Sequence, residues 1–295
     1  MKLDFQPLSL QGQTKYRKIL GMTPQLVSDY SFVNIWSWRE VYGLEWAFDQ
    51  ELVWIRQNRP ERLYWAPMGP WGQTDWSKVF KGDWWQGEQF TRIPEKLHEL
   101  WLGESFPFEA SGLASNRDHW DYLYSVQELI ALKGNRFHKK KNLLRQFARK
   151  YDYTYQPLTE DLVDKALTLQ TQWCLWRDCE ETTTLESENQ AILNAFADWQ
   201  DLEGVFGAGL EVDGNMVAYT VAEALDETTV VIHFEKGCPQ HKGVYQAINQ
   251  MFLANSASEF NYVNREQDLG DAGLRKAKES YNPVDYMKKY SGRLG

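Results

Sequence analysis

The feature that most constrains the fold is a pair of apolar runs joined by Asp213-Gly214 in the C-terminal half of the chain. Asp-Gly between two such runs is a strong local signal for a β-hairpin, because both turn residues adopt positive φ angles that few other residues tolerate. The pattern predicts antiparallel strands at 205–212 and 216–224. Apolar spacing and capping residues then predict helices at 159–177, 188–199, 245–254 and 271–281, and strands at 229–235 and 260–264.

The N-terminal half carries a weaker copy of the same pattern. Its spacing predicts helices at 29–38, 97–102 and 121–132, and strands at 44–48 and 52–56. The order helix, hairpin, strand, loop, helix, strand, helix is that of the acyl-CoA N-acyltransferase (GNAT) fold. We therefore expect an α+β protein of two tandem GNAT-like domains, at 1–132 and 133–295, each with a mixed, mainly antiparallel sheet flanked by helices.

Composition sets limits on the class of protein. The 295 residues suffice for two domains, and 43% hydrophobic with 25% charged residues is the profile of a globular chain, which excludes intrinsic disorder. We see neither a run of about 20 apolar residues nor an apolar signal core at the N-terminus. The three cysteines form no C-x-x-C pair, so we expect free thiols, a cytoplasmic protein and no metal site.

A basic block interrupts an otherwise acidic chain of formal net charge −9. No acidic residue lies between Leu129 and Tyr151, whereas the following cations do: Lys133, Arg136, Lys139, Lys140, Lys141, Arg145, Arg149 and Lys150. The block has the spacing of an amphipathic helix, with Phe137, Leu144 and Phe147 on its apolar side. Such a block indicates either an anionic partner, namely phosphate, RNA or a lipid headgroup, or a solvated helix face.

The loop at 240–245 resembles the strand-to-helix loop that binds the CoA pyrophosphate in acyl-CoA N-acyltransferases. It has the Gln and the first Gly of that pattern at Gln240 and Gly243, but Tyr245 stands where a tiny residue is needed. A phenol there obstructs the approach of the phosphates. The loop therefore predicts weak or absent acyl-CoA binding.

Two further groups carry candidate chemistry. His233 and Glu235 alternate on one strand, which predicts a shared face, and either can serve as a general base; a hydrogen-bonded His beside an exposed Glu is the structural alternative. Residues 264–278 run from a strand end through a polar loop into a helix and contain Asn264, Glu266, Asp268, Arg275 and Lys278. This segment indicates either a substrate site or a capped, ion-paired surface.

The motifs together resemble a family of bacterial proteins grouped with the C-terminal domain of phosphatidylglycerol lysyltransferases. They are His138-Lys139-Lys140-Lys141-Asn142, His233-Phe234-Glu235-Lys236, Tyr245-Gln246 with Ile248-Asn249, and Asn264-Arg265-Glu266 through Tyr281 and Pro283, with a weaker match over 29–38. The resemblance implies tandem acyltransferase-like domains that move an aminoacyl group from aminoacyl-tRNA. This chain lacks the membrane-spanning portion of the lipid enzymes.

The expected function is that of an aminoacyl or acyl transferase with a hydroxyl or amine acceptor and no tightly bound cofactor. Aminoacyl-tRNA is favoured over acyl-CoA as the donor; a CoA-dependent N-acetyltransferase and a non-catalytic binding protein are the alternatives. Glu235 and His138 are the candidate bases. The candidate ligands of an anionic substrate (a tRNA 3′ end, a phosphate or a lipid headgroup, with peripheral membrane contact) are Lys139, Lys140, Asn142, His233, Tyr245, Asn264, Glu266, Asp268, Arg275 and Lys278. We expect His138 and Arg275 to share one cleft where the domains meet.

Overall fold

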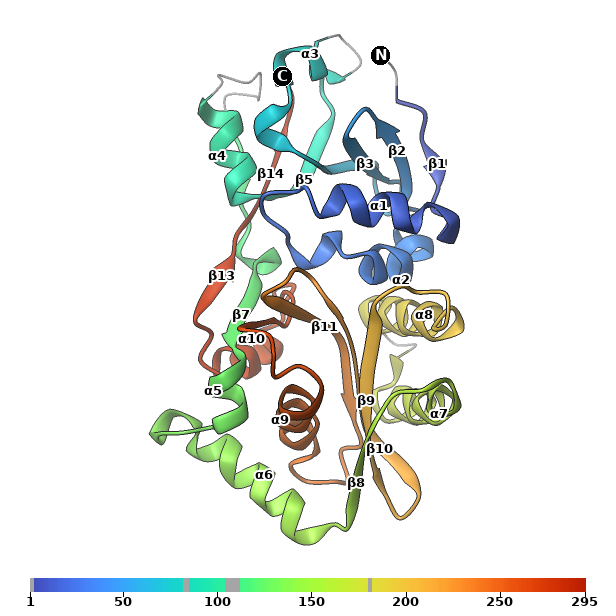
Figure 1. Cartoon of the computed structure of the whole chain (residues 1–295), viewed down its shortest axis with the longest axis vertical. Helices are drawn as coiled ribbons and strands as arrows, with labels where there is room; N and C mark the ends of the chain where they lie inside the picture. Colours follow the sequence, from blue (N-terminus) through green and yellow to red (C-terminus); the bar gives the residue numbers. More distant parts are fainter. Residues whose placement is uncertain (1–2, 82–84, 104–111, 180–181) are drawn as a thin grey trace. The chain divides into compact units, whose positions relative to one another are not determined.

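The computed structural model describes residues 3–81, 85–103, 112–179 and 182–295. The chain forms two compact units, each with its own sheet (Figure 1). The first unit comprises Met1–Asp121, Gln267–Gly270 and Met287–Gly295, and the second comprises Tyr122–Glu266 and Asp271–Tyr286.

The sheet of the first unit has the strand order β1-β2-β3-β4-β5-β14-β6. Its strands are β1 (Gln6–Pro7), β2 (Glu45–Asp49), β3 (Leu52–Gln57), β4 (Leu63–Met68), β5 (Gln89–Pro94), β6 (Ala114–Ser115) and β14 (Lys289–Arg293). Its described helices are α1 (Gln13–Leu20), α2 (Phe32–Tyr42), α3 (Trp76–Val79) and α4 (Glu95–Gly103). The predicted hairpin at 44–56 is confirmed. The helix expected at 29–38 begins later, because the Ser31 side chain caps α2 by accepting a hydrogen bond from the Asn34 N–H.

The second unit repeats this plan with the order β13-β7-β12-β11-β10-β9-β8. Its strands are β7 (Asp121–Ser125), β8 (Tyr153–Pro157), β9 (Val205–Val212), β10 (Asn215–Ala224), β11 (Thr229–Gly237), β12 (Tyr262–Asn264) and β13 (Asp285–Met287). Its described helices are α5 (Val126–Ala131), α6 (His138–Lys150), α7 (Glu160–Arg177), α8 (Thr183–Ala197), α9 (Val244–Ser256) and α10 (Ala272–Glu279). The basic block is the helix α6, as its spacing predicts.

The central hairpin has the conformation that the sequence requires. Asp213 and Gly214 both have positive φ angles, 52° and 77°, and join β9 to β10, which pair antiparallel from Val212↔Asn215 onward. Two positive φ angles give the turn the same twist as the strands. The Asp271 cap of α10 is also confirmed, since its Oδ1 accepts a hydrogen bond from the Leu274 N–H.

The two sheets have equivalent topology. In each sheet, a parallel pair of strands follows the hairpin: β4 with β5, and β11 with β12. The second strand of each pair also pairs antiparallel with a further strand, β5 with β14 and β12 with β7. This is the tandem GNAT-like α+β fold that the element order predicts. The two units do not coincide with the expected domains 1–132 and 133–295. The strand β7, which precedes residue 133, belongs to the second sheet, and the C-terminal β14 belongs to the first.

The predicted helix at 121–132 is wrong over its first half. Residues Asp121–Ser125 form β7, which pairs with β12 through Leu123↔Asn264 and Tyr124↔Val263. Only Val126–Ala131 is helical, and the Ser125 side chain caps that helix by accepting from the Glu128 N–H. The strand depends on a partner far away in sequence, and local spacing does not contain that partner.

The expectation of free thiols is also wrong for two of the three cysteines. Cys174 and Cys179 form a disulfide, and Cys238 is free and buried. The helix α7 ends at Arg177, and Asp178 follows with a left-handed backbone. This reversal brings the two Cα atoms to 5.0 Å, which is within the range that a disulfide spans.

Helices cover both faces of the second sheet. In Figure 1, α7 and α8 lie together on one face and α9 lies on the other. A buried cluster fills the α9 face and includes Tyr122, Ile232, Phe252 and Val263. Aromatic rings such as Tyr122 and Phe252 are part of this cluster, and burying such rings contributes strongly to the apolar stabilisation of a core.

Candidate active site

A gap between two neighbouring strands organises the candidate site of the second unit. The strands β11 and β12 pair in parallel only from Thr229↔Tyr262 to Val231↔Asn264. Beyond that point β11 continues to Gly237 paired with β10, whereas the chain leaves β12 after Asn264. Side chains rather than backbone hydrogen bonds therefore connect the second half of β11 to the residues that follow β12.

Glu235 and Arg265 form the first of these connections. The Arg265 Nη2 donates to Glu235 Oε1 at 2.9 Å, and Asn249 Nδ2 from α9 donates to Glu235 Oε2 at 3.1 Å. The exposed fractions of the Glu235 and Arg265 side chains are 8% and 15%. The Arg265 Nη1 is buried without a hydrogen-bond partner in the described part of the chain. An orphaned donor on a nearly buried guanidinium is costly, so this atom is a candidate for contact with a ligand.

Lys140 and Tyr281 complete this group, which we call the Arg265 cluster: Lys140, Glu235, Asn249, Arg265 and Tyr281. Lys140 Nζ lies 3.8 Å from the centroid of the Tyr281 ring, and the Arg265 guanidinium lies 4.8 Å from it. Burial, and then the charge of Arg265, lower the pKa of Lys140 to about 8. Lys140 has no ion-pair partner among the described residues. The cluster thus holds two cations at one tyrosine ring, and only Arg265 is paired with the carboxylate of Glu235, which favours an anionic ligand.

His233 forms the second connection across the gap. It is a bulged residue, because β10 and β11 change register between Val221↔Phe234 and Ala222↔Ile232. Its Nδ1 lies 2.8 Å from Glu266 Oε1 and its Nε2 lies 3.1 Å from Glu223 Oε1. Burial alone would lower the pKa of His233, but the two carboxylates overcome burial and raise that pKa to about 9.

The bulge changes the expected arrangement of His233 and Glu235. It interrupts the alternation that predicted a shared face, and the two side chains have different partners: Glu223 and Glu266 for the imidazole, Asn249 and Arg265 for the carboxylate. Both ring nitrogens of His233 thus contact carboxylates in this structure.

The segment that carries Arg265 is fixed by polar contacts on both sides. Asn264 Oδ1 accepts from the Glu266 N–H at 2.8 Å, and Lys278 Nζ donates to the carbonyl oxygens of Arg265 and Glu266. Glu266 is in turn held by His233. Three of the predicted ligand-binding residues, Asn264, Glu266 and Lys278, thus hold the backbone from which Arg265 reaches Glu235.

Tyr245 and Gly243 fill the place of a phosphate-binding loop. The Tyr245 hydroxyl accepts from Trp173 Nε1 at 3.0 Å, and burial raises its pKa. Gly243 has a φ of +89°, and a Cβ there would lie 2.2 Å from the backbone oxygen of Leu143. The backbone of α6 thus covers the start of α9, where amide groups hold the pyrophosphate in a CoA-binding protein.

The other predicted residues lie elsewhere. His138, Lys139 and Asn142 are exposed on α6, and Arg275 is half-exposed on α10. Asp268 belongs to the first unit, where it is buried, pairs with Arg117 at 3.4 Å and accepts from the Gly270 N–H. Arg265, Asn249 and Tyr281 were not predicted as site residues, although all three lie within the recognised motifs.

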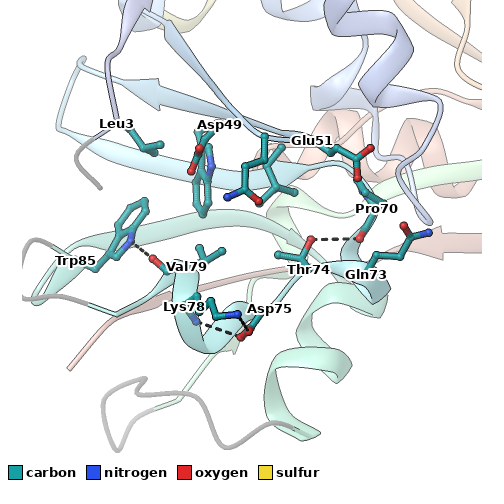
Figure 2. Close-up of a pocket in the computed structure, with 13 residues that line it drawn as sticks. Leu3, Asp49, Glu51, Pro70, Gln73, Thr74, Asp75, Lys78, Val79 and Trp85 are labelled. Atoms are coloured by element: carbon teal, nitrogen blue, oxygen red, sulfur yellow. Dashed lines mark hydrogen bonds and ion pairs between the residues drawn. The ribbon is translucent and has the colours of Figure 1, made fainter.

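The first unit contains a separate hollow of about 390 Å³, which Figure 2 shows. Its wall includes Thr74, which donates to the Pro70 carbonyl oxygen, and Trp85, which donates to the Val79 carbonyl oxygen. Lys78 pairs with Asp75 at 2.9 Å. These polar groups are satisfied within the unit, whereas the indole Nε1 of Trp54, which also lines the hollow, has no partner among the described residues. The ion pair of Lys78 and Asp75 is exposed, whereas that of Arg265 and Glu235 is nearly buried, so we take the second unit as the chemical candidate.

The two sheets and their order of strands define a protein of the tandem GNAT-like fold class. The chain belongs to the family described as phosphatidylglycerol lysyltransferase, C-terminal, whose model matches residues 22–292. A conserved protein of unknown function from Bacteroides thetaiotaomicron is 27% identical, with a TM-score of 0.90 and 100% of both chains covered. L-PGS from Bacillus licheniformis has the same fold at 12% identity, with a TM-score of 0.66 and 99% and 94% of the two chains covered.

A curated relative is also similar in sequence. An uncharacterised protein of Mycoplasmoides gallisepticum is 24% identical over 172 residues, which are 58% of this chain and 54% of that protein. The match thus spans about half the length of this relative. None of the helices in the described ranges is long and apolar enough to cross a membrane.

Proposed function

We propose that the second unit transfers an aminoacyl group from aminoacyl-tRNA to a hydroxyl or amine acceptor at the Arg265 cluster. The observation that carries the proposal is the Glu235 carboxylate, held at 2.9 Å by Arg265 in the strand gap; Lys140 contacts the same Tyr281 ring as Arg265. Membership in the lysyltransferase family supports the reaction class. Function depends on the site and not on the fold, so the chemistry must come from these side chains.

The cluster supplies each group that acyl transfer requires. The acceptor oxygen or nitrogen attacks the ester carbonyl of the donor, a new acyl bond forms, and the bond to the ribose oxygen breaks. Glu235 accepts the proton of the acceptor, because its two hydrogen bonds leave further lone pairs of the carboxylate free, and then returns that proton to the departing ribose oxygen. Arg265 Nη1 and Lys140 Nζ stabilise the oxyanion and the departing ribose oxygen.

The backbone of α6 covers the N-terminal end of α9, and this favours aminoacyl-tRNA over acyl-CoA as the donor. Tyr245 is hydrogen-bonded to Trp173, and Gly243 lies against the Leu143 carbonyl oxygen. A CoA pyrophosphate that binds the backbone amides at the start of α9 would have to displace both contacts.

The test follows a labelled amino acid from aminoacyl-tRNA to three acceptors: phosphatidylglycerol vesicles, a free amine and a peptide amine. We expect transfer to one of them by the unaltered chain and none by Glu235→Gln. Glu211→Gln is the matched control, because Glu211 also sits in an ion pair, with Lys165, on another strand of the same sheet. Retained transfer by Glu235→Gln, or no transfer by the unaltered chain, contradicts the proposal. Donor binding without transfer identifies a binding protein instead.

A further inference from the structure

A second basic feature of the second unit lies apart from the Arg265 cluster. A hollow of about 300 Å³ is lined by Gln146, Arg149 and Lys150 of α6 and by Lys242 of the loop before α9. No acidic residue lines it, and none of its three cations forms an ion pair within the described residues. The helix α6 and the loop before α9 thus bring cations together in one hollow. A row of lysines on a single helix face would not form such a site.

An unsatisfied polar atom lies beside this hollow, on the residue that precedes Lys242. His241, the neighbour of Lys242, has a buried Nδ1 with no hydrogen-bond partner in the described part of the chain. Its ring packs against Tyr151, with centroids 4.8 Å apart. Burial, and then the charge of Lys150, lower the pKa of His241. Lys150 therefore lies close to the imidazole, and the more weakly acting Asp213 carboxylate opposes its effect on the pKa of His241.

We infer that this hollow binds a phosphodiester group of the RNA donor, at a distance from the reacting end. The RNA follows from the proposed function, whereas the anion site follows from the cations and the hollow. The helix α6 connects the two places, since Lys140 contacts Tyr281 and Lys150 lies ten residues further on. At 1.5 Å per residue the separation along the helix is ~15 Å. A stacked strand with a rise of 3.4 Å per nucleotide covers that distance in about four nucleotides.

The surface favours an RNA strand over a membrane. A helix that lies in a membrane surface carries large apolar side chains beside its cations. The exposed large hydrophobic residues of the described chain include none from α6, whose Leu143 and Leu144 are half-buried. A concave site also fits one phosphate group better than a flat bilayer does.

The experiment uses RNA oligonucleotides of two and of six nucleotides that carry a non-hydrolysable 3′-aminoacyl amide, with the full chain. We expect the triple variant Arg149→Ala, Lys150→Ala, Lys242→Ala to bind the longer RNA on the order of tenfold more weakly, with a reduced salt slope. Binding of the shorter RNA should not change. Arg145→Ala is the matched control, because Arg145 is an exposed cation of α6 that does not line the hollow.

A site-specific signal separates this binding from a general effect of charge. An anion between Lys150 and Lys242 offsets the nearby positive charge, so the longer RNA should raise the pKa of His241, measured by NMR, and the shorter RNA should not. Equal affinity of the triple variant and the unaltered chain for the longer RNA overturns the inference while the proposed function stands, provided that Arg265→Lys still weakens both RNAs.

Other outcomes point to other occupants. If neither RNA binds, both the proposal of an aminoacyl-tRNA donor and the present inference are wrong. Binding to vesicles of phosphatidylglycerol and phosphatidylcholine that depends on the three cations, with RNA binding unchanged in the triple variant, assigns the hollow to a membrane. Binding of CoA that depends on them, with RNA binding unchanged, assigns it to a nucleotide cofactor.

Discussion

Arg265 and Glu235 join the two separated strands of the second sheet, with the guanidinium Nη2 2.9 Å from the carboxylate Oε1. Arg265 directly follows the last residue of β12 that pairs with β11, and Glu235 lies beyond the last residue of β11 that pairs with β12. The ion pair therefore sits where the backbone ladder has ended. It fixes a nearly buried carboxylate, and the guanidinium Nη1 has no hydrogen-bond partner among the residues that the structure describes.

The first prediction compares two arginines of the same motif. Arg265→Lys keeps the charge but loses the planar fork that contacts Glu235. We expect transfer to fall at least about tenfold, since a lysine cannot donate to Glu235 and also present a second directed N–H to the substrate, as Nη2 and Nη1 of Arg265 can. Arg275→Lys should have a smaller effect, because Arg275 is half-exposed on α10. Thermal unfolding of both variants checks that each folds.

The opposite order of effects contradicts this assignment. A larger loss in Arg275→Lys would favour the site that the sequence predicts, in which Arg275 and His138 hold the anionic substrate. That shared site stays a prediction.

The second prediction concerns the pH dependence of donor binding. Burial and Arg265 lower the pKa of Lys140 to about 8. Lysine is a cation below its pKa, so attraction to an anionic donor is present below pH 8 and is lost as pH rises through that value. In Lys140→Arg the affinity should stay constant to pH 9.5. Lys139→Arg is the control, because Lys139 is exposed on the same helix and should keep the pH dependence of the unaltered chain. Titrations by fluorescence anisotropy at several pH values measure this, and a flat profile in the unaltered chain would falsify the role of Lys140.

The third prediction concerns the stability of the second unit. The pKa of His233 is raised from 6.5 to about 9 in the folded state, because the bonds to Glu223 and Glu266 outweigh burial. A raised pKa means that folding binds the proton, so this stabilisation is complete below pH 6.5 and disappears as pH rises through 9. A shift of this size corresponds to roughly 2–4 kcal/mol.

Urea unfolding of the unaltered chain and of His233→Gln at pH 6 and at pH 9.5 tests this stabilisation. The difference in the free energy of unfolding between the two proteins should shrink by that amount at the higher pH. A difference that does not depend on pH means that folding leaves the pKa of His233 unchanged, which contradicts the prediction.

The parts of the fold that the sequence predicts are those with local causes. Asp213-Gly214 determines a hairpin from its own two φ angles, and the Asp271 cap depends on an amide three residues away. The strand β7 was predicted as a helix because its partners are the residues Tyr262–Asn264. The disulfide was missed because it depends on the left-handed turn at Asp178, which brings two cysteines of unremarkable spacing together.

In the candidate site, too, the sequence predicts what has a local cause and misses what depends on residues far away in the chain. Glu235 and Lys140 were predicted from their motifs, but the motif gave equal weight to every charged residue between Asn264 and Lys278. Which arginine reaches Glu235 depends on where β12 stops pairing, and that is a property of the sheet. The shared face of His233 and Glu235 failed for a related reason, since one bulge in the register of β10 and β11 breaks the alternation of side chains.

The last prediction concerns acetyl-CoA. We expect no binding by calorimetry, because Tyr245 is hydrogen-bonded to Trp173 and the α6 backbone covers Gly243. Two obstacles act there, so Tyr245→Ala alone should not create binding, although it removes the phenol that the sequence identifies. Tyr245→Phe is the control for the hydrogen bond alone and should lower the stability by about 1 kcal/mol. Stoichiometric binding of acetyl-CoA by the unaltered chain would establish the N-acetyltransferase alternative. Binding by Tyr245→Ala only would mean that the phenol is the sole obstacle and that the contact with Leu143 yields to the ligand.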